Sequence, residues 1–165
     1  MPLAVIIYRK ELDLWNPGAH SGTFRGNQLA MAAGLATLGY LRENDVPSNA
    51  AIMGLRFREQ LLAVQKRCSF IGEIRGKGLM IGVEIVDARQ TDRLGRLTGD
   101  PITAKRIQRE CFDRGVILEL GGRNGAVVRL LPPLNITSEQ VDKVCAVFTE
   151  ACDAVSVSDE AVALV

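Results

Sequence analysis

The chain has 165 residues, of which 47% are hydrophobic and 24% charged, as is typical of one globular domain. Its 20 basic and 19 acidic side chains give a formal net charge of +1, so no broad field attracts nucleic acid or an anionic membrane surface. The longest apolar run, Leu3–Tyr8, is too short to span a membrane, and the N-terminus lacks signal-peptide features. We therefore expect a cytoplasmic protein that binds neither nucleic acid nor membranes.

The cysteines and the histidine give no sign of a metal site. None of the four cysteines belongs to a C-x-x-C pair, and Cys145 and Cys152 lie seven residues apart in one expected helix. We interpret all four as buried thiols in a reducing compartment. His20 is the only histidine, so no pair of ligands at metal-binding spacing exists, and a Ser-His-Asp triad would depend on this one loop residue.

The first part of the chain predicts one strand and two helices. Leu3–Tyr8 is a continuous run rich in β-branched residues, which indicates a buried strand. After a turn-rich loop, an Ala-rich and well-buried helix is expected from Asn27 to about Arg42. A second helix, with one apolar stripe, is expected from about Asn49 to Cys68.

The middle of the chain predicts a hairpin followed by a loop. Ile71–Arg75 and Met80–Val86 are expected strands on either side of a turn that contains Lys77, which we interpret as a solvated residue. In the second strand alternate residues suggest one buried face and one wetter face. Residues 90–99 are polar without an apolar period, and this indicates a mobile loop.

A third helix and a second pair of strands are expected next. Asp100 is a candidate N-cap with Pro101 at the first helical position, and the helix should run to about Arg114. Val116–Glu119 and Ala126–Leu130 are expected strands that flank a glycine-rich turn.

The last helix has the clearest amphipathic pattern. Thr137 and Gln140 match a capping box, and apolar residues then recur every three or four positions up to Val155. Residues 156–165 show no strong pattern and are expected to form a flexible tail. Strands in hairpin-like pairs with helices grouped around them predict an α+β two-layer domain, because a doubly wound sheet needs strict strand–helix alternation.

The loop Gly22-Thr23-Phe24-Arg25-Gly26-Asn27 runs directly into the first helix. Free backbone N–H groups and the positive end of the helix dipole suit an anion there, and Thr23 and Arg25 add a hydroxyl and a charge. On local physics alone a polar turn that caps the helix is the favoured interpretation. The loop is not a P-loop, since it lacks the Gly-Lys-Ser/Thr ending.

Arg129 lies inside the apolar stretch Val127–Leu131 and needs a partner, because burying a bare guanidinium is costly. A structural ion pair with Glu84 or Glu119 is the favoured interpretation from the residues alone. The alternative is a substrate carboxylate, which arginine binds well through two parallel hydrogen bonds.

Three segments in order resemble the pyridoxal-phosphate-dependent class III aminotransferases. They are a Thr-Phe-x-Gly-Asn loop before an Ala-rich helix, an Arg-Gly-x-Gly-Leu-Met-x-Gly-x-Glu hairpin at residues 75–84, and an Arg-x-x-Pro-Pro-Leu-x-Ile-Thr stretch at residues 129–137. The details Pro-Gly-Ala-His and Arg-Gly-Asn-Gln, at residues 17–20 and 25–28, are similar to the diaminobutyrate transaminases in particular.

The resemblance implies the C-terminal small domain of a fold-type I aminotransferase at residues 49–155, with a short, mostly antiparallel sheet and helices. Residues 1–48 would be one strand, the phosphate loop and a long linking helix from the large domain. Thr23 would bind the phosphate of pyridoxal 5'-phosphate in the neighbouring subunit of a homodimer. Arg129 would contact a substrate carboxylate, and the substrates would be amino acids and 2-oxo acids.

The resemblance assigns no catalytic residue to this chain. In the family, the lysine that holds the cofactor covalently comes before a strand that begins here at Pro2, and none of the five lysines matches that position. The chain is therefore expected to be inactive alone. Open alternatives are a non-catalytic binding or dimerisation module, another class III type (ornithine, acetylornithine or 4-aminobutyrate), and an unrelated α+β binding module.

Overall fold

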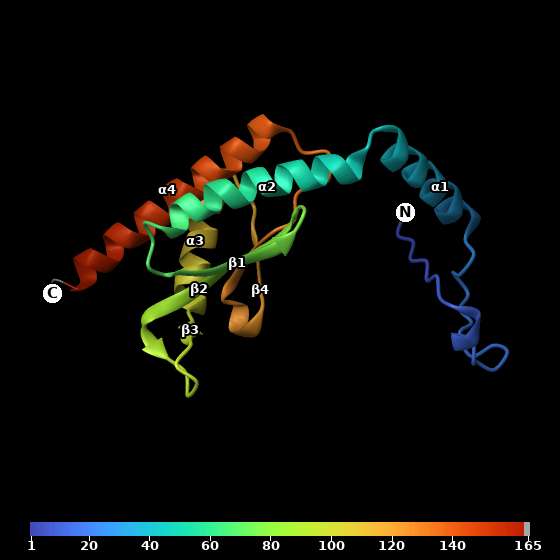
Figure 1. Ribbon diagram of the computed structural model, residues 1–165, viewed down its shortest axis with the longest axis horizontal. Helices are drawn as coiled ribbons and strands as arrows, with labels where there is room; N and C mark the ends of the chain where they lie inside the picture. Colours follow the sequence, from blue (N-terminus) through green and yellow to red (C-terminus); the bar gives the residue numbers. More distant parts are fainter. Residues whose placement is uncertain (164–165) are drawn as a thin grey trace. The chain divides into compact units, whose positions relative to one another are not determined.

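The computed structural model describes residues 1–163, with side-chain burial described up to residue 157 (Figure 1). The chain divides into two compact units, Met1–Val46 and Pro47–Val165. The first unit ends at Val46, two residues before the expected domain boundary at residue 48. Within the described residues, no helix is both long and apolar enough to cross a membrane.

Unit 1 contains a short 3-10 helix, η1 (Lys10–Leu12), and one long helix, α1 (Gln28–Glu43). The expected helix is confirmed, but its expected burial is wrong within this unit, where Ala30 is the only buried residue of α1. The prediction of a buried strand at Leu3–Tyr8 is also wrong: the segment is exposed and forms no strand. A strand needs a neighbour for its backbone N–H and C=O groups, and the described residues of unit 1 contain no other strand.

Unit 2 is an antiparallel sheet with three helices, which confirms the expected α+β class. The strands follow the order β1-β2-β5-β4, and β3 pairs separately with β2. The elements are α2 (Val46–Gln65), β1 (Ile71–Lys77), β2 (Met80–Thr91), β3 (Leu97–Gly99), α3 (Pro101–Asp113), β4 (Glu119–Gly121), η2 (Arg123–Gly125), β5 (Val127–Leu130) and α4 (Ser138–Ala163).

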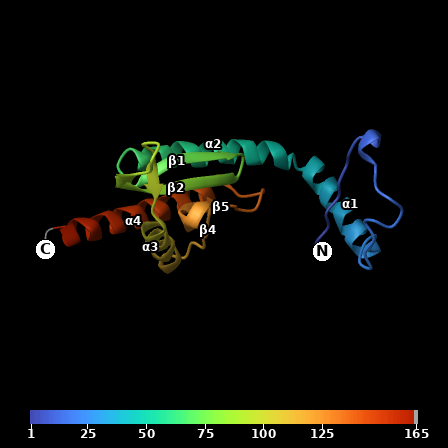
Figure 2. The same ribbon diagram turned by 90° about the horizontal axis from the view of Figure 1, so that it is seen from below.

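One face of the sheet packs against α2, α3 and α4. The core brings together Phe57, Ile107 and Phe148 from the helices with Val83 and Val128 from the strands, all of them almost fully buried. Each large apolar side chain removed from water in this way contributes about 1.5–3 kcal/mol. Figure 1 shows α2 and α4 on the same side of β1 and β2, and the turned view in Figure 2 shows these two strands running side by side along α2.

The other face of the sheet is open and carries charged side chains. Arg75 and Glu84 on this face form an ion pair at 3.6 Å, and their side chains are 44% and 37% exposed. Burial alternates along β2 from Met80 to Ile85, which confirms the expected buried and wetter faces over these residues, whereas Val86, expected on the wetter face, is buried.

Two segments are more ordered than the sequence suggests. Residues 90–99 are not a loop throughout, because β2 extends to Thr91 and β3 pairs back onto it. The Asp92 carboxylate closes the turn: it accepts hydrogen bonds from the backbone N–H of Leu94 (2.8 Å) and of Arg96 (3.0 Å). Likewise α4 continues beyond the expected end at Val155 to Ala163, and residues 164–165 lie outside the described part.

Both expected helix caps are confirmed. Asp100 accepts hydrogen bonds from the backbone N–H groups of Ile102 and Thr103, at 2.9 and 3.0 Å, with Pro101 in the first turn of α3. Thr137 and Gln140 cap α4 reciprocally, each side chain accepting from the backbone N–H of the other, at 3.0 and 3.4 Å.

Candidate cofactor and substrate site

Thr23 begins the turn that leads into α1. Gly26 has φ of +71°, a left-handed conformation that favours glycine, and the side chain of Asn27 caps the helix by accepting from the N–H of Ala30 at 3.0 Å. Arg25 stabilises the turn by donating from Nη1 to the carbonyl oxygen of His20 at 2.9 Å. Within the described residues, the Thr23 hydroxyl has no hydrogen-bond partner, and the residue is exposed.

The cap and the candidate anion site therefore use different residues. The side chain of Asn27 alone caps the helix, and the Thr23 hydroxyl remains free to bind a ligand. A free hydroxyl is a donor that suits a phosphate oxygen, and the turn that carries Thr23 leads to a helix N-terminus, whose dipole favours an anion.

Arg129 lies on the open face of the sheet rather than inside the core. Its neighbours along β5, Val128 and Leu130, are buried, whereas the Arg129 side chain is 43% exposed. The expectation of a buried guanidinium is therefore wrong, because the strand alternates and turns this residue outward.

The ion-pair partner of Arg129 is one of the two that were expected. Nη1 of Arg129 lies 3.2 Å from Oε2 of Glu119, whereas Glu84 pairs with Arg75. Exposed ion pairs of this kind contribute only ~0–1 kcal/mol to stability. The Arg129 guanidinium is thus accessible to a second carboxylate.

Gly121 is a further neighbour of Arg129, and no motif in the sequence points to it. A Cβ atom built on Gly121 would lie 2.5 Å from Cδ of Arg129, so the arginine side chain occupies the space that any other residue would fill. The sequence gives little indication of this contact, because Gly121 is one of several glycines in a turn-rich stretch.

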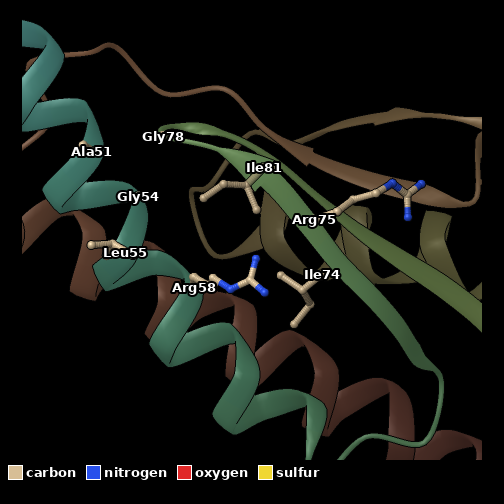
Figure 3. Close-up of a pocket in the computed structure, with 9 residues that line it drawn as sticks. Ala51, Gly54, Leu55, Arg58, Ile74, Arg75, Gly78 and Ile81 are labelled. Carbon is tan, nitrogen blue, oxygen red and sulfur yellow. The ribbon is translucent and has the colours of Figure 1, made fainter.

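The β1–β2 hairpin carries the second motif and borders a shallow hollow of about 260 Å³. Figure 3 shows Arg58 of α2 directed toward this hollow and Arg75 directed away from it. Gly54 of α2 lies so close to the backbone of Gly78 that a Cβ there would collide with it. The expected hairpin is confirmed, Lys77 is exposed, and the glycines permit close packing of helix and turn.

The four cysteines are free and buried, as expected. Burial raises the pKa of the Cys111 thiol to about 12 and that of the Cys145 thiol to about 12 as well, which keeps both protonated and unreactive. Among the described residues, no group of three or more His, Cys, Asp or Glu side chains is arranged to hold a metal ion.

Thr23 and Arg129 belong to different units of the chain, Thr23 to unit 1 and Arg129 to unit 2. Each is exposed within its own unit and each has the chemistry to bind an anion: Thr23 through a free hydroxyl, and Arg129 through a guanidinium held by one exposed carboxylate.

Curated relatives share much of this sequence. The chain is 51% identical over 152 residues to a diaminobutyrate–2-oxoglutarate aminotransferase of Rhizobium meliloti (strain 1021), a match that covers 92% of this chain and 32% of that protein. It is 44% identical over 144 residues to the protein of the same name from Haemophilus influenzae, covering 87% of this chain and 32% of that protein. The chain thus spans about a third of the length of the curated relatives it matches.

Solved structures of aminotransferases also resemble this chain. An ornithine aminotransferase from Toxoplasma gondii matches 90% of this chain and 32% of its own, with a TM-score of 0.73 and 27% identity. An acetylornithine aminotransferase from Elizabethkingia anophelis matches 86% of this chain and 34% of its own, with a TM-score of 0.70 and 28% identity. The family model for "Aminotransferase class-III" matches residues 1–152, and the chain therefore belongs to the class III aminotransferases.

Proposed function

We propose that this chain is the C-terminal portion of a pyridoxal-phosphate-dependent L-2,4-diaminobutyrate:2-oxoglutarate aminotransferase. Such an enzyme exchanges an amino group between glutamate and aspartate 4-semialdehyde. The observation that carries the proposal is the 51% identity over 152 residues to a protein of that name. The chain would supply contacts to the cofactor and the substrate, and the residues that perform the proton transfers would come from the rest of the enzyme.

Thr23 fits a role at the cofactor phosphate. The residue is exposed, its hydroxyl has no partner among the described residues, and it lies in the turn that leads to Asn27, the N-cap of α1. When bound, pyridoxal phosphate supplies an electron sink for the amino-group exchange. Thr23 would donate a hydrogen bond to a phosphate oxygen and help to fix the orientation of the cofactor from across a dimer interface.

Arg129 fits a role at a substrate carboxylate. The planar guanidinium presents parallel N–H donors that match the two oxygens of a carboxylate, and an exposed ion pair with Glu119 holds it on the open face of the sheet. It would orient the amino acid or 2-oxo acid so that its reacting carbon faces the cofactor.

A homodimer with shared sites agrees with the exposed apolar surface of unit 1. Ile7, Phe24 and Leu35 are 94%, 89% and 74% exposed, and large apolar side chains left in water gain free energy when a second subunit covers them. The four free, buried thiols support the proposal of a cytoplasmic protein, since a reducing compartment keeps cysteines unpaired.

A chimera tests the proposed function. The matched C-terminal third of the Rhizobium meliloti relative is replaced by this chain, and transamination of 2-oxoglutarate is measured with diaminobutyrate, ornithine, acetylornithine and 4-aminobutyrate as donors. We expect pyridoxal phosphate absorbance and highest kcat/KM with diaminobutyrate. Preference for another donor would point to another class III type.

A folded dimeric chimera without transamination would contradict the proposal and favour a non-catalytic binding or dimerisation module. Gel filtration and thermal unfolding identify a chimera that simply fails to fold. If the chimera does not fold, the chain is mixed with the separate large-domain segment of the relative. Restored binding of pyridoxal phosphate is then measured instead of transamination.

A further inference from the structure

The direction of the Arg129 side chain is set by its neighbours on the open face of the sheet. In the antiparallel register, Arg129 lies opposite Gly82 on β2 and opposite Glu119 on β4. Adjacent strands are about 4.8 Å apart, so these two residues are its immediate neighbours. The Arg129 side chain turns toward β4, where Nη1 reaches Oε2 of Glu119 at 3.2 Å.

Gly121, two residues farther along β4, lies beneath the Arg129 side chain. A Cβ built on Gly121 would lie 2.5 Å from Cδ, 3.4 Å from Nη1 and 3.5 Å from Nε of Arg129. Since carbon atoms in van der Waals contact stay about 3.5–4.0 Å apart, the arginine occupies the volume that a side chain at position 121 would need.

The backbone does not explain the glycine at this position. Gly121 is not among the glycines that have a left-handed conformation, such as Gly122 with φ of +70° and Gly125 with φ of +75°. Any L-residue can adopt the backbone of Gly121 without strain. The constraint at position 121 therefore comes from the space that the Arg129 side chain fills.

We propose that Gly121 is a positioning residue for Arg129: its missing side chain lets the guanidinium lie against β4 beside Glu119, in the direction that receives the substrate carboxylate. The inference rests on the proposed function, in which Arg129 binds that carboxylate. A bidentate hydrogen bond depends on the direction of the guanidinium plane as well as on its charge. A methyl group at position 121 lifts Cδ and turns the plane away from the carboxylate.

The test compares Gly121→Ala with Gly82→Ala in the chimera. Both changes add one methyl group beside Arg129 on the same face, but a Cβ at Gly82 would meet Val127 at 3.1 Å, with no Arg129 atom among its nearest contacts. For Gly121→Ala we expect KM for 2-oxoglutarate to rise about tenfold or more, since hydrogen bonds to a charged group are weakened, while the melting temperature stays close to the wild-type value. For Gly82→Ala we expect less than a threefold change in KM.

A double-mutant cycle shows whether Gly121 acts through Arg129. In an Arg129→Ala background, Gly121→Ala should leave KM for 2-oxoglutarate within about twofold, because the displaced side chain is already gone. An undiminished effect in that background would mean that the methyl group acts on the strand, and it would overturn the proposal. So would an unchanged KM in the single variant.

A measurement on this chain alone separates the geometry from the proposed function. The Nε–H resonance of Arg129, assigned by its disappearance in Arg129→Lys, should shift in Gly121→Ala and stay in place in Gly82→Ala. An unmoved resonance in Gly121→Ala contradicts the positioning role even if the chimera transaminates. The resonance can also shift while the chimera is active and Arg129→Ala leaves its KM for 2-oxoglutarate unchanged. That result would confirm the contact between Gly121 and Arg129 and would exclude Arg129 from binding the substrate carboxylate.

Discussion

Thr23 is the residue of unit 1 on which the proposed cofactor contact depends. In the chimera, Thr23→Ala should weaken pyridoxal phosphate binding about tenfold or more, because a hydrogen bond to a charged phosphate contributes about 1.5–3 kcal/mol. Thr37→Ala is a matched control, since the Thr37 hydroxyl donates to the carbonyl oxygen of Ala33 within α1 at 2.8 Å. Cofactor titration followed by absorbance measures both, and equal affinity of Thr23→Ala and wild type would exclude Thr23 from the phosphate site.

For single residues, the sequence predicted the interactions of the Arg129 side chain better than it predicted the burial of that side chain. It indicated that Arg129 needs an acidic partner and named Glu119 among two candidates, which the structure confirms. It suggested a buried guanidinium for Arg129, because apolar residues at all neighbouring positions hide which face of the strand Arg129 takes. The contact of Gly121 with Arg129 could not be predicted from the sequence. Glycine has no side chain that indicates a role, and the contact depends on the pairing of β4 with β5.

At the scale of elements, local signals located the helices and the strands β1, β2 and β5. The strand expected at Val116–Glu119 was misplaced, because β4 runs from Glu119 to Gly121 and residues 116–118 form no strand. Caps are made by residues close in sequence, so Asp100 and Thr137 were recognisable without any tertiary information. Strand β3 was missed because it is only three residues long, and its pairing with β2 depends on a turn closed by the Asp92 carboxylate. The apolar run Leu3–Tyr8 was wrongly expected to be a strand, since a run of this kind predicts a strand only where a neighbour is present to pair with it.

The contact between α2 and α4 also depends on residues far apart in sequence. Arg56 donates two hydrogen bonds of 2.7 Å to the carboxylate of Asp142, and Gln60 donates a third at 2.7 Å. These bonds, first that from Arg56 and then that from Gln60, lower the pKa of Asp142 to about 2. The ionised carboxylate is thus favoured in the folded state, and it ties the two helices together on the surface of unit 2.

This link predicts a pH-dependent contribution to stability. Because the folded pKa of Asp142 lies below its ordinary value of 3.8, its contribution is fully present above about pH 4 and is lost as pH falls toward about 2. Asp142→Asn should therefore lower the urea midpoint of unfolding at pH 6, and the difference from wild type should shrink between pH 4 and pH 2. Asp113→Asn, which breaks a pair with Arg109 inside one helix, should change the midpoint less at pH 6. A difference for Asp142→Asn that stays constant down to pH 2 would contradict this role of the carboxylate.

At the scale of the whole molecule, the two units differ in how they are stabilised. The residues of the core cluster all lie between Phe57 and Val155, within unit 2. The buried hydrophobic residues of unit 1 are Ala30 and Val46, whereas Ile7, Phe24 and Leu35 are almost fully or largely exposed. Unit 2 therefore has the core of an independent domain, and unit 1 depends on further contacts for burial of its apolar surface.

This difference predicts how the chain behaves when it is divided. A fragment of residues 45–165, which keeps all of α2, should unfold cooperatively in urea and remain monomeric in sedimentation velocity across a wide concentration range. The full chain should self-associate as its concentration rises, because the apolar surface of unit 1 gains free energy when it is covered, at about 25 cal/mol per Å². Leu35→Lys in the full chain should reduce this association, whereas Leu94→Lys, on an exposed loop of unit 2, should leave it unchanged. Association of the fragment as strong as that of the full chain would place the responsible surface in unit 2, and with it the contacts by which this chain joins the rest of an aminotransferase.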